Sequence, residues 1–445
     1  MHQDRSGGWR PQFSEEFTYV GYDWYPECGC LLLRYRLDDI ALQERFDFPL
    51  PDSTSRIPVE ALSAAFELLF WTAGISYWKA GCPRRVIFAG AGPDGWQASW
   101  LNRLFREGLA EFAFLQGLVA QDFTVFASSR PRPPAAMAVG LDDQFLVPMG
   151  GGKDSLVAWS RLDRLGRVAA TIQVGQSVLI GEVALRAGPR HLRIGRRMDP
   201  RLAELNAAGA YNGHVPVTAI NATAAVVLAL LHGHGSIAFA NERSADEPTL
   251  VDDTGESVNH QFAKTLAFEC MLDDWVRHYI AADLAVFSLL RRDRELAICR
   301  EFAGLAQFHD VFSSCNRNFH LDGPRTQRWC CNCPKCRFVY LGLAPFLPAN
   351  GLKRIFGADL LADEAQVEGF RRLLALDGHK PFECVGEANE ARAVIRRLQD
   401  SPEWRQKAVV QALAPLLQGL SVPDIEELCQ PGGPHLLPEE VLDES

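Results

Sequence analysis

Six consecutive residues between an apolar run and an amphipathic run have the types that bind an anion. They are Gly150, Gly151, Gly152, Lys153, Asp154 and Ser155. Three residues without side chains let the backbone approach a bulky anion and direct its N–H groups at it, and the helix expected next adds its positive end. Lys153 offers a cation to phosphate oxygens and Ser155 a donor, whereas Asp154 would repel phosphate unless it orients the loop or holds Mg²⁺. The string predicts a nucleotide-binding turn.

Two familiar phosphate-binding motifs do not describe this turn. The G-x-x-x-x-G-K-[ST] spacing of a Walker A loop is absent, and a dinucleotide fingerprint fails at Asp154 and Ser155. The simpler interpretation is a glycine-rich turn whose Asp and Ser cap a helix. Because a strand is expected before the turn and a helix after it, we favour nucleotide binding.

The elements around the turn predict an α/β fold with a parallel sheet. Strand-like runs such as "FLVPM", "AATIQV" and "SIAFAN" alternate with helical runs such as "SLVAWSRLDRLG". Residues 13–50 read mainly as strands, and helical periodicity begins near residue 58. The Pro-rich stretch "SSRPRPPAAMAVG" suggests a linker. We therefore predict an N-terminal α+β domain (1–138), a nucleotide-binding domain (139–348) and a helical C-terminal region (349–445).

The composition narrows the class of protein. The chain has 445 residues, 47% hydrophobic and 22% charged, with a net charge of -10. This acidic balance argues against a broad nucleic-acid surface. The first residues lack the apolar core of a signal peptide and no apolar run is long enough to span a bilayer, so we expect no membrane partner and a cytoplasmic location. In that compartment, 12 cysteines suit thiols or metal ligands better than disulfides.

Five of those cysteines cluster near residues 315–336. Three follow a C-x-x-C-x-x-C spacing, and a fourth upstream could complete a tetrahedral structural zinc site; these four are Cys315, Cys330, Cys333 and Cys336. Cys331 is an extra thiol that leaves the choice of the fourth ligand open. The alternative is a set of thiols without metal.

The string GGGKDS resembles the PP-loop of the ATP pyrophosphatase superfamily, usually written SGGxDS, with Gly150 at the position of the leading serine. The resemblance implies cleavage of ATP between its α- and β-phosphates, with the loop holding the departing pyrophosphate. It also implies that the end of the second strand, at Gln173 and Val174, faces the adenine. The cysteine cluster is similar to the four-cysteine zinc site that follows the PP-loop domain in cyano-deazaguanine synthases.

Over nearly its whole length the chain resembles the ATP-dependent UDP-N-acetylmuramoyl-L-alanyl-L-glutamate epimerases (MurL type) of bacterial peptidoglycan synthesis. The resemblance is carried by "FSEEFTYVGYDW", "GGGKDS", "ANERSADEPTLVDDTGESVNHQFAKTLAFE" and "CCNCPKCRFVYLGL". It implies that ATP and Mg²⁺ serve to convert the terminal L-Glu of UDP-MurNAc-L-Ala-L-Glu to D-Glu through an acyl adenylate. Adenylation removes the carboxylate charge that would otherwise oppose loss of the α-proton.

For such a reaction, proton-transfer groups are sought in the third of these segments. We select His260 and Lys264, which would share one face if "VNHQFAKTLAFE" is helical, then Glu242 and Asp246. Arg243 could hold a carboxylate or phosphate of the substrate. A hydrogen-bonded structural histidine and a solvated lysine are the ordinary alternatives.

Three further histidines and two other functions complete the expectations. His214, His232 and His234 suit turns and helix ends better than chemistry. Another PP-loop enzyme that adenylates a different carboxylate or a base (a ligase, an amidase, a tRNA-modifying or a cyano-deazaguanine synthase-like enzyme) is the main alternative, and a regulatory ATP-binding module without turnover is the second. Pyrophosphate release would exclude the module. The oligomeric state stays open.

Overall fold

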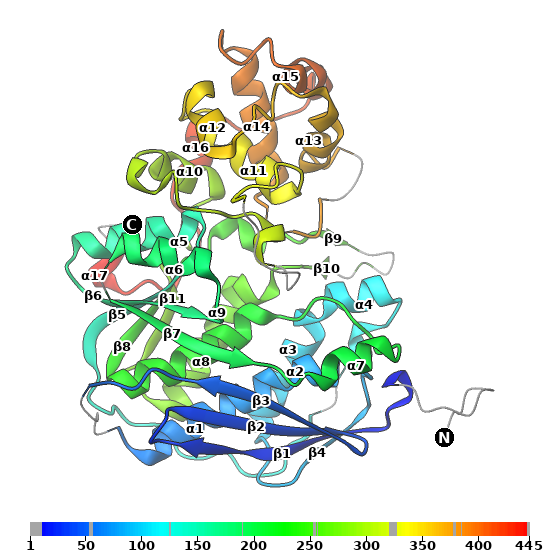
Figure 1. Ribbon diagram of the computed structural model, residues 1–445, viewed down its shortest axis with the longest axis vertical. Coiled ribbons are helices and arrows are strands. Elements are labelled where there is room, and N and C mark those ends of the chain that lie inside the picture. The colour runs from blue at the N-terminus through cyan, green and yellow to red at the C-terminus, as the bar shows by residue number, and fades with distance from the viewer. Residues whose placement is uncertain are drawn as a thin grey trace.

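A single nine-stranded mixed sheet crosses the body of the protein (Figure 1). The computed structural model describes residues 11–52, 57–123, 126–188, 190–251, 255, 257–319, 327–376, 380–383 and 385–442. Along the sheet the strands follow the order β11-β8-β5-β6-β7-β3-β2-β1-β4. A two-stranded ribbon, β9 (Leu250–Val251) and β10 (Ser257–Val258), lies apart from it.

Five of the nine strands form a parallel half. They are β5 (Asp142–Pro148), β6 (Val168–Val174), β7 (His191–Arg197), β8 (His234–Phe239) and β11 (Ala285–Ser288). The connecting helices are α5 (Lys153–Arg164), α6 (Val178–Ala187), α7 (Arg201–Ala207), α8 (Val217–His232) and α9 (Leu266–Trp275). The expected alternation of strands and helices is thus confirmed, and the protein is of the α/β class.

The other half of the sheet is built by the N-terminal residues. Here β1 (Glu16–Tyr25), β2 (Cys30–Leu37) and β3 (Ile40–Asp47) form an antiparallel meander, and β4 (Arg85–Phe88) pairs in parallel with β1. Because β3 pairs with β7 in antiparallel register, the two halves share hydrogen bonds. Strands on both sides of residue 138 thus belong to one sheet; the division into three domains stays a prediction.

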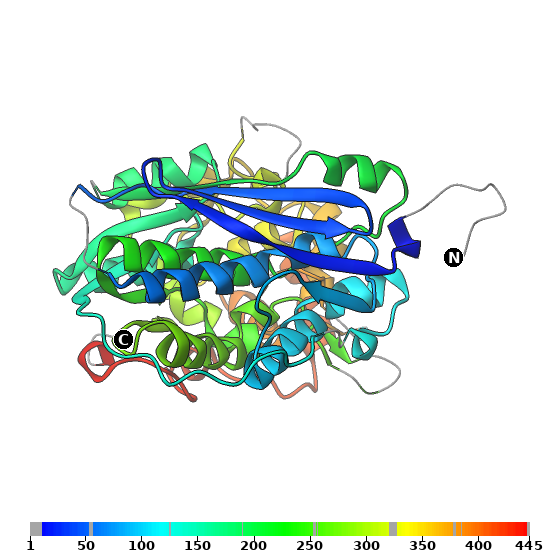
Figure 2. The same cartoon turned by 90° about the horizontal axis from the view of Figure 1, so that it is seen from below.

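Each face of the parallel half packs on its own hydrophobic core, as alternation along a strand requires. In β5, Phe145 and Val147 point into one core, with α5 and the C-terminal helices, while Leu146 points into the other. This second core includes α1 (Val59–Ala73) and α8, which lie side by side against the sheet (Figure 2). The N-terminal aromatic residues contribute to it; Trp71 and Trp78, for example, are each 1% exposed.

Three further helices belong to the N-terminal half. They are α2 (Ile75–Trp78), α3 (Gly95–Gly108) and α4 (Ala110–Gln116). The stretch Val59–Trp78 is long and apolar enough to cross a membrane, but 67% of its apolar window is buried within the protein. Burial of this kind is typical of a core helix.

The C-terminal part is helical, as expected, and forms the upper lobe of Figure 1. Its helices are α10 (Glu295–Ala303), α11 (Pro334–Leu343), α12 (Ala349–Phe356), α13 (Val367–Leu373), α14 (Ala388–Gln399), α15 (Ala408–Leu413), α16 (Ile425–Leu428) and α17 (Glu439–Leu442). The last of these returns to the main body, where Glu440 forms an ion pair with Arg167.

Candidate active site

The glycine string lies where open α/β sheets bind ligands, at the carboxyl end of a parallel strand beside a change in strand order. β5 has β8 on one side and β6 on the other, so the chain leaving β5 enters the point where the connections diverge. The segments after β8 and β11 end at the same edge. They bring Glu295 into an ion pair with Lys153, and they bring Glu242 within electrostatic reach of Glu295.

The loop itself is shaped by its glycines. Gly151 has a φ of +78°, a left-handed conformation that glycine adopts without strain. A Cβ on Gly152 would lie 2.6 Å from the Ser314 hydroxyl, so the loop backbone touches the neighbouring segment. The Ser155 hydroxyl donates to the Gly152 carbonyl (3.1 Å) and accepts from the Gly150 N–H (3.4 Å). Gly152 is the N-cap residue of α5, and it has no side chain to accept a hydrogen bond from the first turn of this helix. The positive end of α5 therefore lies open at the loop.

Lys153, which the sequence predicts to offer a cation to phosphate oxygens, is a buried counter-ion of two carboxylates in the structure. It is 1% exposed and its ammonium forms ion pairs with Asp154 and Glu295. Burial opposes the charge, but the two carboxylates raise the pKa of Lys153 well above its usual value. A charged lysine in the interior needs such partners. The sequence could not show this arrangement because Glu295 follows 142 residues later.

The two carboxylates around Lys153 differ in their protonation. Burial alone would raise the pKa of Asp154, but Lys153, Lys335 and Lys264 together hold it below its usual value. Burial raises the pKa of Glu295 to about 7, with the charge of Asp154 adding to the effect and Lys153 opposing it. Asp154 is therefore ionised at neutral pH and can serve as an oxygen ligand. Lys335, which the sequence reasoning missed, lies between two of the cluster's cysteines.

The side chain of Gln173, expected near adenine, is engaged inside the protein. Its amide donates to the carbonyls of Gly175 (3.2 Å) and Ser177 (3.3 Å), and its oxygen contacts His191 at 3.0 Å. Gln173 thus supports the turn after β6. Val174, half-buried, ends that strand at the same edge of the sheet as the glycine loop.

The four predicted metal-ligating cysteines converge. The Sγ atoms of Cys315, Cys330, Cys333 and Cys336 all lie within 4.8 Å of one another, including separations of 3.4 Å and 3.8 Å. Four sulfurs about 2.3 Å from one tetrahedral zinc are separated by about 3.8 Å. Cys331 lies outside the set, with its thiol 3.3 Å from the Phe356 carbonyl. The donor set therefore fits a zinc ion.

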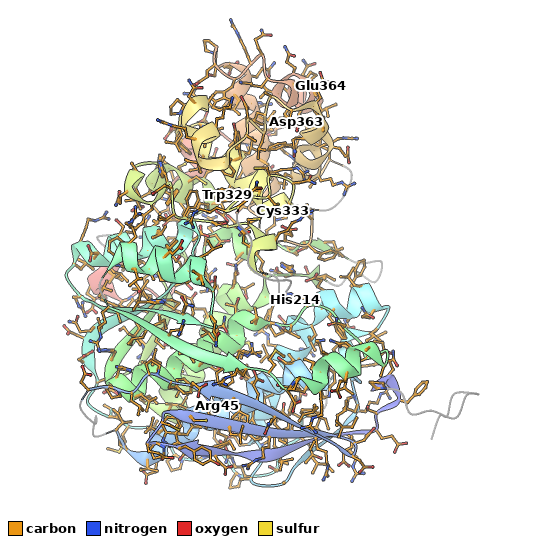
Figure 3. All side chains as sticks on the ribbon, in the orientation of Figure 1. Arg45, His214, Trp329, Cys333, Asp363 and Glu364 are labelled. Atoms are coloured by element: carbon orange, nitrogen blue, oxygen red, sulfur yellow. The ribbon has the colours of Figure 1, made fainter. Side chains whose placement is uncertain are left out.

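The cysteine cluster and the glycine loop are connected directly. The segment entering Cys315 contacts the loop, where the Ser313 N–H donates to the Gly151 carbonyl (2.9 Å). On the other side, Cys333 caps α11 by accepting from the Cys336 N–H, which fixes the helix turn that carries Lys335. Figure 3 labels Cys333 and Trp329 in this region, above His214. The cysteine cluster thus positions the segment at Ser313, which contacts the glycine loop, and the helix turn that carries Lys335.

The expectation that His260 and Lys264 share one face of a helix is wrong. The structure has a turn at residues 260–261 followed by a 3-10 helix, Phe262–Lys264, and α9 begins only at Leu266. The physical reason is Thr265, whose hydroxyl accepts from the Phe268 N–H and caps α9. Lys264 nevertheless lies within electrostatic reach of the site, since its charge lowers the pKa of both Asp154 and His214.

His260 lies in a cluster with two residues that the sequence reasoning did not select. The Glu111 carboxylate pairs with Nδ1 of His260 and lies 3.7 Å from Nδ1 of His214. The two imidazole rings are 4.6 Å apart. Burial first, then His260 and Lys264, lowers the pKa of His214 to about 4, so this ring is neutral at neutral pH. His214 was assigned a turn role, and it does lie in the loop before α8.

The remaining predicted residues have structural contacts. The Glu242 carbonyl accepts from Arg291 (2.9 Å), and its side chain is buried. Asp246 accepts from the Leu266 N–H (2.9 Å) at the start of α9. Arg243 packs its guanidinium against Gly432 and Gly433 of the C-terminal segment. His232 ends α8 and His234 begins β8, at the opposite end of the parallel strands from the glycine loop.

Comparison with known proteins places this chain in a family. Residues 10–289 match the family model of the MurL N-terminal domain, and residues 311–427 match that of the MurL C-terminal domain. The chain belongs to the MurL family. The N-terminal match includes the glycine loop and the Glu111 cluster, whereas the C-terminal MurL match includes Lys335 and the cysteines.

Three curated relatives carry the name UDP-N-acetyl-alpha-D-muramoyl-L-alanyl-L-glutamate epimerase. The protein of Xanthomonas oryzae pv. oryzae is 43% identical over 85% of this chain and 84% of its own. The protein of a Micromonospora species is 40% identical over 95% of this chain and 96% of its own, and that of Salinispora tropica is 39% identical over 96% and 95%.

Proposed function

We propose that this MurL-family chain epimerises the terminal L-Glu of UDP-MurNAc-L-Ala-L-Glu to D-Glu for peptidoglycan synthesis, with ATP as co-substrate. The observation that carries the proposal is the similarity to three epimerases over 85–96% of the chain. The composition agrees, since a net charge of -10 suits a small-molecule substrate better than nucleic acid. A cytoplasmic location is part of this proposal.

The glycine loop supports a role for ATP and a PP-loop type of nucleotide binding. Its bare backbone at the positive end of α5, at the carboxyl edge of a parallel sheet, is suited to the departing pyrophosphate. The substrate carboxylate would attack the α-phosphorus, forming an acyl–phosphate bond and releasing pyrophosphate. Asp154, held ionised by its three lysines, would hold Mg²⁺. Bound Mg²⁺ neutralises phosphate charge.

Adenylation prepares the substrate for proton transfer. In the adenylate the carboxyl group is neutral, so the electron pair of the Cα–H bond can move onto the carbonyl oxygen when a base removes the proton. His260 and Lys264 are the proposed proton-transfer groups, one removing a proton and the other returning one to the opposite face of the carbon. Water then cleaves the acyl–phosphate bond, giving D-Glu and AMP. Arg243, whose guanidinium packs against the C-terminal segment, is proposed to hold a carboxylate or phosphate of the substrate.

A structural zinc ion at the four cysteines is the third element of the proposal. The sulfur separations fit tetrahedral zinc, and four thiolates leave no position for water. Binding energy at such a site adds to folding stability. A bound zinc ion would also stabilise the nucleotide site, because Ser313 contacts Gly151 and the charge of Lys335 acts on Asp154.

The proposal is tested with purified protein, ATP, Mg²⁺ and UDP-MurNAc-L-Ala-L-Glu in deuterium oxide. We expect pyrophosphate and AMP to form, and deuterium to appear at the glutamate α-carbon. Pyrophosphate without deuterium would indicate a ligase-like adenylating enzyme instead. ATP binding without either product would leave only a nucleotide-binding module.

A further inference from the structure

The cluster of Glu111, His214 and His260 lies outside the glycine loop and is assembled from distant parts of the chain. Glu111 is on α4, His214 is in the loop before α8, and His260 follows β10. Glu111 and His260 are 149 residues apart. Local packing alone rarely brings a carboxylate and two imidazoles within 4.8 Å of one another, as they are here.

The surroundings hold the three side chains in place. Asn259 donates to the Ala245 carbonyl (2.9 Å) and accepts from the Gln261 N–H (2.7 Å), which fixes the turn at His260. The loop of His214 is tied to the N-terminal helices through Asn212, whose carbonyl accepts from Gln116 (3.0 Å). Glu111 itself is 7% exposed. These contacts set the imidazole positions before any substrate binds.

The contact with Glu111 sets the role of each ring nitrogen of His260. When Nδ1–H of His260 donates to the Glu111 carboxylate, Nε2 of the neutral ring is an acceptor. A carboxylate in this position selects the tautomer and stabilises the imidazolium that forms on proton uptake. The His260 side chain is 15% exposed and that of His214 is 24% exposed, so a substrate can reach them.

A cavity lies near the cluster, although Glu111, His214 and His260 are not among the residues that line it. The cavity has a volume of about 810 Å³, a size suited to a large ligand, and lies between α4 and residues 246–248 and 257–267. Ala110 and Asn259, which line it, precede Glu111 and His260 in the chain. Lys264 lies within electrostatic reach of both His214 and Asp154, and so connects the cluster to the glycine loop.

We propose that Glu111 is the positioning residue that makes His260 the base for one face of the glutamate α-carbon, with His214 as a neutral neighbour that keeps the ring in place. Nε2 of His260 takes the α-proton, the Cα–H electron pair becomes the enolate, and Glu111 balances the new imidazolium charge. This inference rests on the proposed epimerase function. It adds Glu111 and His214, which no sequence motif indicated.

The carboxylate of Glu111 and the imidazoles of His214 and His260 are also close enough to bind a divalent cation. This alternative predicts a metal ion at the cluster instead of proton transfer by His260. The positive charge of Lys264 acts on His214, which disfavours a further cation there. A pairing between Glu111 and His260 that is already formed also occupies the ligand oxygen. These two observations favour proton transfer.

The test compares Glu111→Gln, Glu111→Asp and His260→Asn with the unmodified protein in deuterium oxide. Pyrophosphate formed in a single turnover reports adenylation, and deuterium at the glutamate α-carbon reports proton transfer. We expect Glu111→Gln and His260→Asn to keep pyrophosphate formation within about threefold and KM for UDP-MurNAc-L-Ala-L-Glu nearly unchanged, but to lose about 10²–10³-fold in deuterium incorporation. Glu111→Asp should recover part of this loss.

Two matched controls separate the role from general damage. His232→Gln changes a half-buried histidine at the far end of α8, and Glu67→Gln changes a carboxylate paired with Arg130. Both should keep deuterium incorporation. The inference is overturned if Glu111→Gln incorporates deuterium within threefold of the unmodified protein. It is equally overturned if the unmodified protein holds one more equivalent of divalent metal than the Glu111→Gln variant. Absence of pyrophosphate from the unmodified protein, with deuterium present, would instead refute adenylation.

Discussion

Removal of Lys153 should destabilise the protein through two carboxylates rather than through lost phosphate contacts alone. Its ammonium is 1% exposed and pairs with Asp154 and with Glu295, whose side chain is 3% exposed. Replacement by methionine keeps the volume but leaves these carboxylates together in the interior without their counter-ion. Removing one partner of a buried pair costs about 3–5 kcal/mol. We therefore expect Lys153→Met to lower the free energy of unfolding by about that amount.

A second substitution distinguishes this cause from a packing defect. In Lys153→Met/Glu295→Gln one of the two buried carboxyl groups that have lost their counter-ion is replaced by a neutral amide, so about half of the lost stability should return. Lys407→Met is the matched control, because its pair with Asp359 is about one-quarter exposed and should be worth about 1 kcal/mol or less.

The assay is urea-induced unfolding of the four proteins, followed by pyrophosphate release from those that fold. The double variant should be folded yet release pyrophosphate at least about 10²-fold more slowly, since the loop has lost its ammonium. A loss below about 1 kcal/mol in Lys153→Met would refute the counter-ion role. So would a double variant no more stable than the single one.

Three further predictions concern the loop, the metal and pH. Gly152→Ala should slow pyrophosphate release about 10²-fold because its Cβ meets the Ser314 hydroxyl at 2.6 Å, and adding Ser314→Ala to it should restore part of the rate. Gly150→Ala, whose Cβ meets open space, should stay near the unmodified rate. Equal rates for Gly152→Ala and Gly150→Ala would contradict the packing argument. Cys333→Ser should lose about one equivalent of zinc by metal analysis and should unfold at a lower temperature. If the unmodified protein holds less than about half an equivalent of zinc, the zinc site is excluded. Burial and neighbouring carboxylates raise the pKa of Glu390 to about 8, above its unfolded value of 4.5. The stability that Glu390 contributes is therefore full below pH 4.5 and falls by about 1 kcal/mol per pH unit as the pH rises to 8. Glu390→Gln should flatten this slope in unfolding experiments at several pH values, and an unchanged slope would refute the assignment to Glu390.

Local features of the sequence predicted local structure well. Apolar runs with a period of two or of 3.6 marked the parallel strands and their helices, and three glycines between a strand and a helix marked the loop at residues 150–152. The spacing of Cys330, Cys333 and Cys336 indicated thiols that can converge, and Cys315 joins them in the structure. Each of these signals lies within a few residues of the feature that it describes.

Features that depend on distant contacts were not predictable in this way. The pairing of β3 with β7 unites the two halves of the sheet, although no periodicity indicates which edges meet. Glu295 and Glu111 reach the site from 142 and 149 residues away from their partners. The helix expected through His260 was wrong because a single capping threonine, Thr265, determines where α9 begins. That residue was a readable signal, whereas the carboxylates gave none.

The most direct test of the account follows oxygen from the substrate. UDP-MurNAc-L-Ala-L-Glu labelled with ¹⁸O in the α-carboxylate of glutamate is converted with ATP and Mg²⁺, and the nucleotide product is analysed by mass spectrometry. If the carboxylate attacks the α-phosphorus and water later attacks the carbonyl carbon, one labelled oxygen appears in AMP. Unlabelled AMP, or ADP in place of AMP, would contradict an acyl adenylate formed at the glycine loop.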